Sequence, residues 1–77
     1  MNDAEFKLND VLVEILDPTS YRYVIREIEK YGYWIVYLDK NGRLFPTSYW
    51  CSFGEIGRDY IKVGVWDNEN KRVIDVD

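Results

Sequence analysis

The chain has 77 residues, of which 47% are hydrophobic and 31% charged, and its 14 acidic and 10 basic residues give a net charge of −4. This length and composition are typical of one folded domain, so we expect a single domain over residues 1–77 with residues 1–5 flexible. The single cysteine, Cys51, excludes an internal disulfide, and the lack of histidine excludes a Cys/His zinc site and the commonest general base.

The first strand is expected at Asp10–Leu16, the segment "DVLVEIL". Side chains of a strand alternate between two faces, and here both faces carry Val, Leu or Ile. One face should meet a core. The apolar side chains of the other face need a separate explanation.

The next segment, Tyr21–Tyr31, fits two patterns. Its apolar residues recur at i, i+3, i+4 and i+7 from Tyr21, which is a helical spacing. Its composition, "YRYVI", is β-branched and aromatic and favours a strand. We favour the strand, with a bulge near Arg26–Glu27 that returns Ile28 to the inner face, and keep the helix as the alternative.

A hairpin is expected where Tyr33–Lys40, "YWIVYLDK", is followed by Asn41 and Gly42. Asn-Gly between two apolar runs favours a type I′ turn, because both residues tolerate a positive φ. Pro46 lacks a backbone N–H, so the returning strand is expected at an edge of the sheet or to end early.

Alternation along the first arm of this hairpin separates two sets of side chains. The set expected to face the core is Trp34, Val36 and Leu38. The set expected to face outward is Tyr33, Ile35 and Tyr37.

One helical turn is expected at "SFGEIG", because Ser52 and Glu55 have the spacing of a capping box and Gly57 can end the turn. The alternating segment Tyr60–Trp66 then predicts a strand, and Lys71–Asp77 predicts a last strand paired with it.

Two stretches are similar to a known family. The segment Phe6–Ile15, "FKLNDVLVEI", is similar to an F-x-x-G-D-x-V opening, with Asn9 in place of the Gly, and the turn "SFGEIG" precedes "YIKVGV". Over residues 6–66 this pattern resembles the SH3-like small β-barrels, including KOW- and Tudor-type modules. The resemblance implies an all-β fold: a small antiparallel barrel of five to six strands with one short helical turn.

The candidate binding residues are aromatic. Tyr and Trp are enriched at interface hot spots, because each offers a large contact area with a polar group. The alternative is that some of these rings cover the open end of the barrel. The predicted set is Tyr21, Tyr23, Tyr33, Tyr37, Tyr49 and Trp50.

Two other readings stay open. The same rings could stack on nucleic acid if Arg43 and the residues Arg22, Arg26 and Lys30, which share one strand face, supplied the cations, although the net negative charge disfavours it. Alternatively, acidic residues at i, i+2 would lie about 6.7 Å apart along a strand and could imitate phosphates. These pairs are Asp3/Glu5, Glu27/Glu29, Asp67/Glu69 and Asp75/Asp77.

No catalytic residue, cofactor or metal is expected, and no apolar run or leader pattern predicts a membrane or export signal. Small acidic chains of this kind look like accessory proteins of phages and mobile elements. We therefore predict a cytoplasmic, non-enzymatic protein-interaction module that binds and modulates or inhibits a host or defence protein. Both a monomer and a homodimer fit the sequence.

Overall fold

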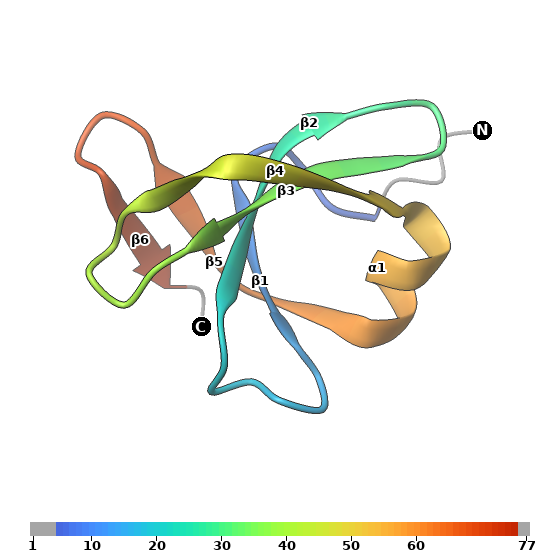
Figure 1. The fold of residues 1–77 in the computed structure, drawn as a ribbon, viewed down its shortest axis with the longest axis horizontal. Coiled ribbons are helices and arrows are strands. Elements are labelled where there is room, and N and C mark those ends of the chain that lie inside the picture. The colour runs from blue at the N-terminus through green and yellow to red at the C-terminus, as the bar shows by residue number, and fades with distance from the viewer. Residues whose placement is uncertain (1–4, 76–77) are drawn as a thin grey trace.

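The computed structural model describes residues 5–75, which form one antiparallel six-stranded sheet and one short helix (Figure 1). The strands run in the spatial order β4-β3-β2-β1-β5-β6, and the described sheet is not closed into a barrel. The expectation of a mainly β chain is confirmed. The elements are β1 (Asp10–Glu14), β2 (Arg22–Ile28), β3 (Gly32–Leu38), β4 (Leu44–Ser52), α1 (Phe53–Asp59), β5 (Tyr60–Asp67) and β6 (Arg72–Asp75).

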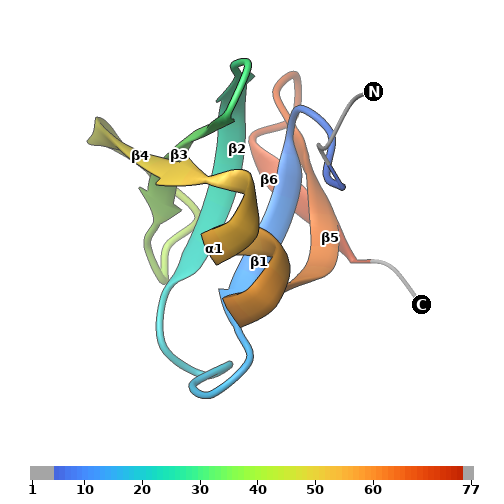
Figure 2. The same ribbon diagram turned by 90° about the vertical axis from the view of Figure 1, so that its right-hand side faces the viewer.

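The helix is the crossing between two separated strands. β4 is an edge strand and β5 lies beside β1, so the chain must cross one face of the sheet between them, and α1 makes this crossing (Figure 2). Ser52 caps the helix, since its Oγ accepts a hydrogen bond from the Glu55 N–H at 3.2 Å, as the capping box predicts. The expected end at Gly57 is wrong, because Gly57 has no left-handed φ and the helix runs on to Asp59.

The ambiguous segment is a strand. β2 pairs with β3, and the register shifts between Ile25 and Glu27, which confirms the expected bulge. The bulge does not return Ile28 to a core, however, and that expectation is wrong. Its side chain is exposed because β1 pairs with β2 only at Tyr23 and Val24, well before the end of the strand.

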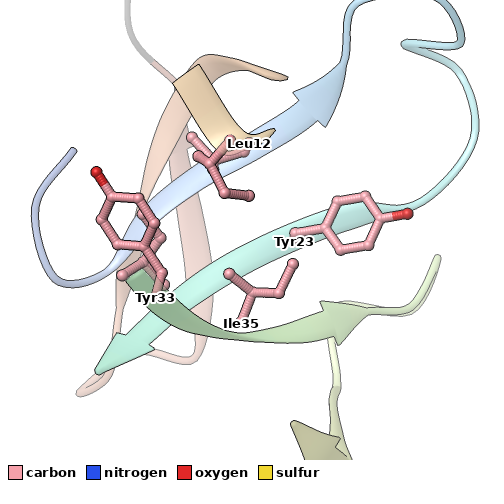
Figure 3. Close-up of a cluster of buried hydrophobic side chains, with 6 residues drawn as sticks. Leu12, Tyr23, Tyr33 and Ile35 are labelled. Carbon is pink, nitrogen blue, oxygen red and sulfur yellow. The ribbon is translucent and has the colours of Figure 1, made fainter. Parts of the chain in front are cut away.

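Both faces of the central strands are buried, because two separate clusters fill the two faces. Val11 and Leu12 are neighbours in β1, both are fully buried, and they belong to different clusters. The first cluster, shown in Figure 3, consists of Leu12, Tyr23, Ile25, Tyr33, Ile35 and Ile56. The second consists of Val11, Val24, Leu38 and Trp66.

Two clusters account for the apolar side chains on both faces of the strands. The second cluster receives Leu44 from β4 and Val73 from β6, the two edges of the sheet, so the sheet curls around it. The first is covered by α1 through Ile56. Leu12 of the first strand therefore has partners inside the molecule, whereas Ile15 and Leu16, beyond the end of β1, are 51% and 97% exposed.

The expected sidedness of β3 is half right. Val36 and Leu38 are buried as expected, whereas Trp34 is only half-buried. Tyr33 and Ile35 were expected to face outward, and this is wrong: they are 1% and 2% exposed, because α1 and the chain before β1 cover this face.

The β3–β4 loop differs from a type I′ turn. Only Gly42 has a positive φ, of 80°, and Asn41 does not. The Asp39 Oδ1 accepts hydrogen bonds from the backbone N–H groups of Asn41 and Arg43, both at 2.9 Å. This side chain favours the three-residue hairpin loop, in which only the last loop residue is left-handed. β4 carries Pro46 and is an edge strand, as expected.

The two chain ends complete the sheet. β6 pairs antiparallel with β5, which confirms the predicted last pairing, and residues 76–77 of the predicted strand lie outside the described residues. Residues 1–4 of the segment expected to be flexible also lie outside them, whereas Glu5 donates its backbone N–H to the Tyr33 hydroxyl at 2.9 Å.

Asn9 occupies a backbone position that favours glycine. Its φ is 71°, in the left-handed region, and its backbone joins two strands: its N–H donates to the Ile25 carbonyl at 2.8 Å, and its carbonyl accepts from the Trp66 N–H at 2.7 Å. Asn is among the few residues besides Gly that adopt this conformation readily.

We expect Asn9→Ala to be less stable than Asn9→Gly by about 1–2 kcal/mol, because only Gly adopts the left-handed φ without steric cost. Both variants lose the hydrogen bond from Arg26 Nη1 to the Asn9 side chain, so their difference isolates the backbone term. Urea unfolding followed by tryptophan fluorescence measures it, and equal stabilities would contradict the backbone assignment.

Candidate binding surface

An exposed group of aromatic rings surrounds Tyr37 on the face that α1 partly covers. The ring centroid of Tyr37 lies 5.3 Å from that of Tyr21, 5.8 Å from that of Phe45 and 5.1 Å from that of Tyr49. Tyr37 is half-buried, while Tyr21, Phe45 and Tyr49 are 52%, 40% and 44% exposed. We call these four residues the aromatic surface.

Strand register brings these rings together. Tyr37 pairs with Tyr23 across β2 and β3, and Tyr49 pairs with the buried Ile35 across β3 and β4. Directly paired residues point to the same face of a sheet, so the rings share the face of the first cluster. Tyr21, just before β2, extends the group beyond the sheet.

Two further tyrosines form the floor of the aromatic surface. Tyr23 is 6% exposed, its ring lies 4.9 Å from that of Tyr37, and its hydroxyl donates to Glu14 Oε1 at 2.9 Å. Tyr60 meets Tyr23 edge-to-face at 5.3 Å. The exposed rings therefore rest on a packed aromatic layer that holds them in place.

The floor is uncharged at neutral pH. Burial, with the hydrogen bond to Glu14, raises the pKa of Tyr23 above its ordinary value. Burial, with the negative charge of Glu14, raises the pKa of Tyr60 to about 12. Burial likewise raises the pKa of the half-buried Cys51 thiol. Deprotonation is therefore disfavoured at each of these three groups.

Of the six aromatic residues predicted as a site, three lie in the aromatic surface: Tyr21, Tyr37 and Tyr49. Tyr23 lies beneath it, so its expected exposure is wrong. Tyr33 lies at the other end of the first cluster, with its hydroxyl pointing away from that of Tyr23 (Figure 3). Its expected exposure is also wrong, because its hydroxyl accepts the backbone N–H groups of Glu5 and Phe6 at 2.9 and 3.2 Å.

Trp50 is 45% exposed but lies on the opposite face, where it pairs with Trp34. A Cβ atom built on Gly32 would come within 2.7 Å of the Trp50 ring and would also clash with the Cys51 carbonyl oxygen. Gly32 is therefore required for β3 to approach β4 beneath this indole. Trp50 covers that junction and is separate from the aromatic surface.

Two aromatic residues of this region are absent from the predicted set. Phe45 shares the strand parity of Tyr49 in β4, and this signal could have been found in the sequence. Tyr60 follows α1 directly, and its place is fixed only by the path of the helix across the sheet. No local pattern indicates that path.

The predicted charged patterns are not assembled among the described residues, 5–75. Arg26 Nη1 donates to the side-chain oxygens of Asn9 and Asn68, and Lys30 lies 5.3 Å from the ring of Tyr31, so the expected basic face is dispersed.

Two of the four acidic pairs, Glu27/Glu29 and Asp67/Glu69, also lack the strand spacing. Glu29 and Glu69 lie outside the strands, and Asp67 accepts hydrogen bonds from the β5–β6 turn. Asp3 and Asp77 are outside the described residues.

Comparison with protein-family models, curated proteins and solved structures finds no match for this chain. Within residues 5–75, no helix is long and apolar enough to cross a membrane, and no group of three or more Cys, Asp or Glu side chains could hold a metal ion. The aromatic surface therefore has to be interpreted from its own geometry.

Substitution of a core tyrosine should lower the free energy of unfolding far more than substitution of a surface tyrosine. Tyr33→Ala removes a fully buried ring and strands two backbone N–H groups, so we expect it to lower the free energy of unfolding by about 3–5 kcal/mol. Tyr49→Ala removes a half-exposed ring and should cost about 1 kcal/mol or less. Chemical denaturation of both variants checks the assignment, and a Tyr49→Ala protein that fails to fold would contradict it.

Stability should fall in alkaline solution. The folded pKa of Tyr60, about 12, lies above the ordinary 10.0, so the folded state keeps this proton after the unfolded state has lost it. The stabilising effect is complete below pH 10 and is lost as the pH rises toward 12.

The absorbance of phenolate during a pH titration of the folded protein measures the loss of the Tyr60 proton directly. Tyr60→Phe should remove one late-titrating tyrosine and weaken the pH dependence of unfolding above pH 10. Simultaneous titration of all tyrosines in the folded protein would refute the burial of this group.

Proposed function

We propose that this protein is a non-enzymatic protein-interaction module and that the aromatic surface is its docking surface. The observation that carries the proposal is the exposure of Tyr21, Phe45 and Tyr49 around Tyr37, above the buried Tyr23 and the half-buried Tyr60. Tyrosine supplies much contact area with few rotatable bonds, so such rings bind at a low entropic cost.

The packing of the rings against one another supports a pre-formed site. Tyr37 contacts four other aromatic rings, so its orientation is set before any partner arrives. Ordering side chains at an interface costs roughly 0.5–1.5 kcal/mol for each flexible group, and rings already held by neighbours avoid most of that cost.

The mode of docking follows from the edge strand. β4 borders the aromatic surface and carries Pro46, which has no N–H to donate to an added strand. This favours a partner held by contacts with the rings over one that extends the sheet. A protein partner also suits the net charge of −4 better than duplex DNA does.

We further propose that the chain is a curled relative of the SH3-like barrels. Two observations support the relation: Asn9, at the position of the Gly in the family opening, has a left-handed φ that favours glycine, and a short helix precedes β5. That the chain is a cytoplasmic accessory protein of a phage or mobile element, acting on a host or defence protein, stays a prediction.

The docking proposal is tested with three Ala variants of exposed rings. Tyr49→Ala and Phe45→Ala remove members of the aromatic surface, and Tyr31→Ala, at 68% exposure in the β2–β3 turn, is the control. A partner captured from the native host by the wild-type protein is purified, and its affinity for each variant is measured by calorimetry.

We expect Tyr49→Ala and Phe45→Ala to weaken binding of the partner by about tenfold or more, as the loss of hot-spot aromatic residues does, and Tyr31→Ala to leave the affinity unchanged. Circular dichroism confirms that each variant is folded. The proposal fails if no partner binds, or if the control weakens binding as much as the other two.

A further inference from the structure

A second feature lies beside the aromatic surface, at the end of the sheet where the β3–β4 loop approaches β6 (Figure 1, left). Three stretches far apart in the sequence line a groove of about 810 Å³: the segment leading into β2, the β3–β4 loop, and the start of β6. Binding sites for small ligands typically have volumes of about 300–1,000 Å³. We call this feature the hairpin groove.

Positive charge converges on the hairpin groove although the chain is acidic overall. Four of the 10 basic residues line it, and they come from all three stretches. They are Arg22, Lys40, Lys71 and Arg72. Lys71 is held at the groove by a left-handed backbone, with a φ of 55°.

Two acidic residues share the lining, Asp39 and Asp75. The Asp39 Oδ1 already accepts two backbone N–H groups of its own loop, which disperses its charge. Asp67 lies close to Arg72, and its carboxylate accepts hydrogen bonds from Asn70 and Glu69. The four cations outnumber the two lining carboxylates and the neighbouring Asp67 taken together, which leaves the groove positive and suits an anion.

The uncharged lining suits a planar ring attached to that anion. Tyr21 is 52% exposed and lines the groove together with Leu38 and Val73, and its ring also lies 5.3 Å from that of Tyr37. Thr19, Ser20 and Asn41 add hydroxyl and amide groups. A base can stack on an exposed tyrosine, and guanidinium groups bind phosphate oxygens in pairs.

We propose that the hairpin groove binds a nucleotide unit, with its phosphate on Arg22 and Arg72 and its base on Tyr21. The unit is either a free nucleotide or part of a single strand of DNA or RNA. This site is separate from docking at Phe45 and Tyr49, which do not line the groove. The cations also differ from those expected from the sequence, since Arg26 and Lys30 lie outside it.

Fluorescence anisotropy of a labelled oligothymidylate and a labelled oligouridylate, titrated with the full chain at low salt, tests the proposal. We expect a Kd of about 10⁻⁵ M that weakens steeply with salt, as phosphate contacts do. Unlabelled ADP is the competitor. If ADP displaces the labelled strand at a concentration similar to the Kd of the strand, the ligand is a free nucleotide. If only an unlabelled oligonucleotide displaces it, the ligand is a single strand. Both results support the site.

Matched variants locate the binding. Arg22→Gln and Arg72→Gln should each weaken binding of the labelled strand about tenfold. Each should also make the slope of log K against log salt concentration shallower by about 0.7, the contribution of one phosphate contact. Arg58→Gln makes the same change on α1, where the side chain is 71% exposed and outside the groove, and should have little effect. Tyr21→Ala should weaken binding about tenfold through lost stacking.

The proposal is overturned if neither labelled strand nor ADP binds. It is also overturned if Arg58→Gln weakens binding as much as Arg22→Gln and Arg72→Gln do, because the effect would then belong to net charge. Unchanged binding by Tyr21→Ala would remove the base from the proposal. Tyr49→Ala, which belongs to the docking surface, should leave the affinity for the strand unaltered, so the two proposals can fail independently.

Discussion

The constraint on which this structure depends is that one sheet has two faces and a chain of 77 residues must shield both. A domain of this size buries only about 60% of the surface that its unfolded chain exposes, so it has little material for a second layer. The chain covers one face by curling the sheet until β4 and β6 reach the same cluster, and the other face with α1. The aromatic surface and the hairpin groove both lie where the curled sheet or α1 stops shielding a face.

The aromatic surface exists because the cover on one face is short. A helix of seven residues is about 10 Å long, whereas a strand of seven residues such as β3 is about 23 Å long. α1 therefore shields the Tyr33 end of β3 and leaves the Tyr37 end open, where side chains of β4 and the start of β2 gather. Aromatic residues suit such a boundary, since their rings cover apolar surface while their hydroxyls reach water.

Patterns local to the sequence predicted local structure well. The strands, the β2 bulge, the edge position of the Pro46 strand and the Ser52 cap all follow from spacing or from the chemistry of one residue. Alternation also separated the two faces of β3 correctly, but it could not tell that both faces are buried. That depends on α1 crossing from β4 to β5, and no residue within β3 records this path. Tyr23 and Tyr33 were misplaced for this reason. Trp50 was misplaced because it follows Tyr49 directly in β4, and adjacent residues of a strand point to opposite faces.

The hairpin groove was beyond sequence reasoning on the same physical ground. Its cations lie at positions 22, 40, 71 and 72, and only the curl of the sheet brings the β3–β4 loop to β6. The curl thus buries the second cluster and also sets the position of the groove at the edge of that cluster. Leu38 and Val73 pack in the cluster and also line the groove. Tyr21 lines the groove and also belongs to the aromatic surface, so the two proposed sites share one residue, and a ligand that fixed its ring at one site would change the free energy of binding at the other. Because such coupling between two binding equilibria is reciprocal, its sign and size can be measured from either side.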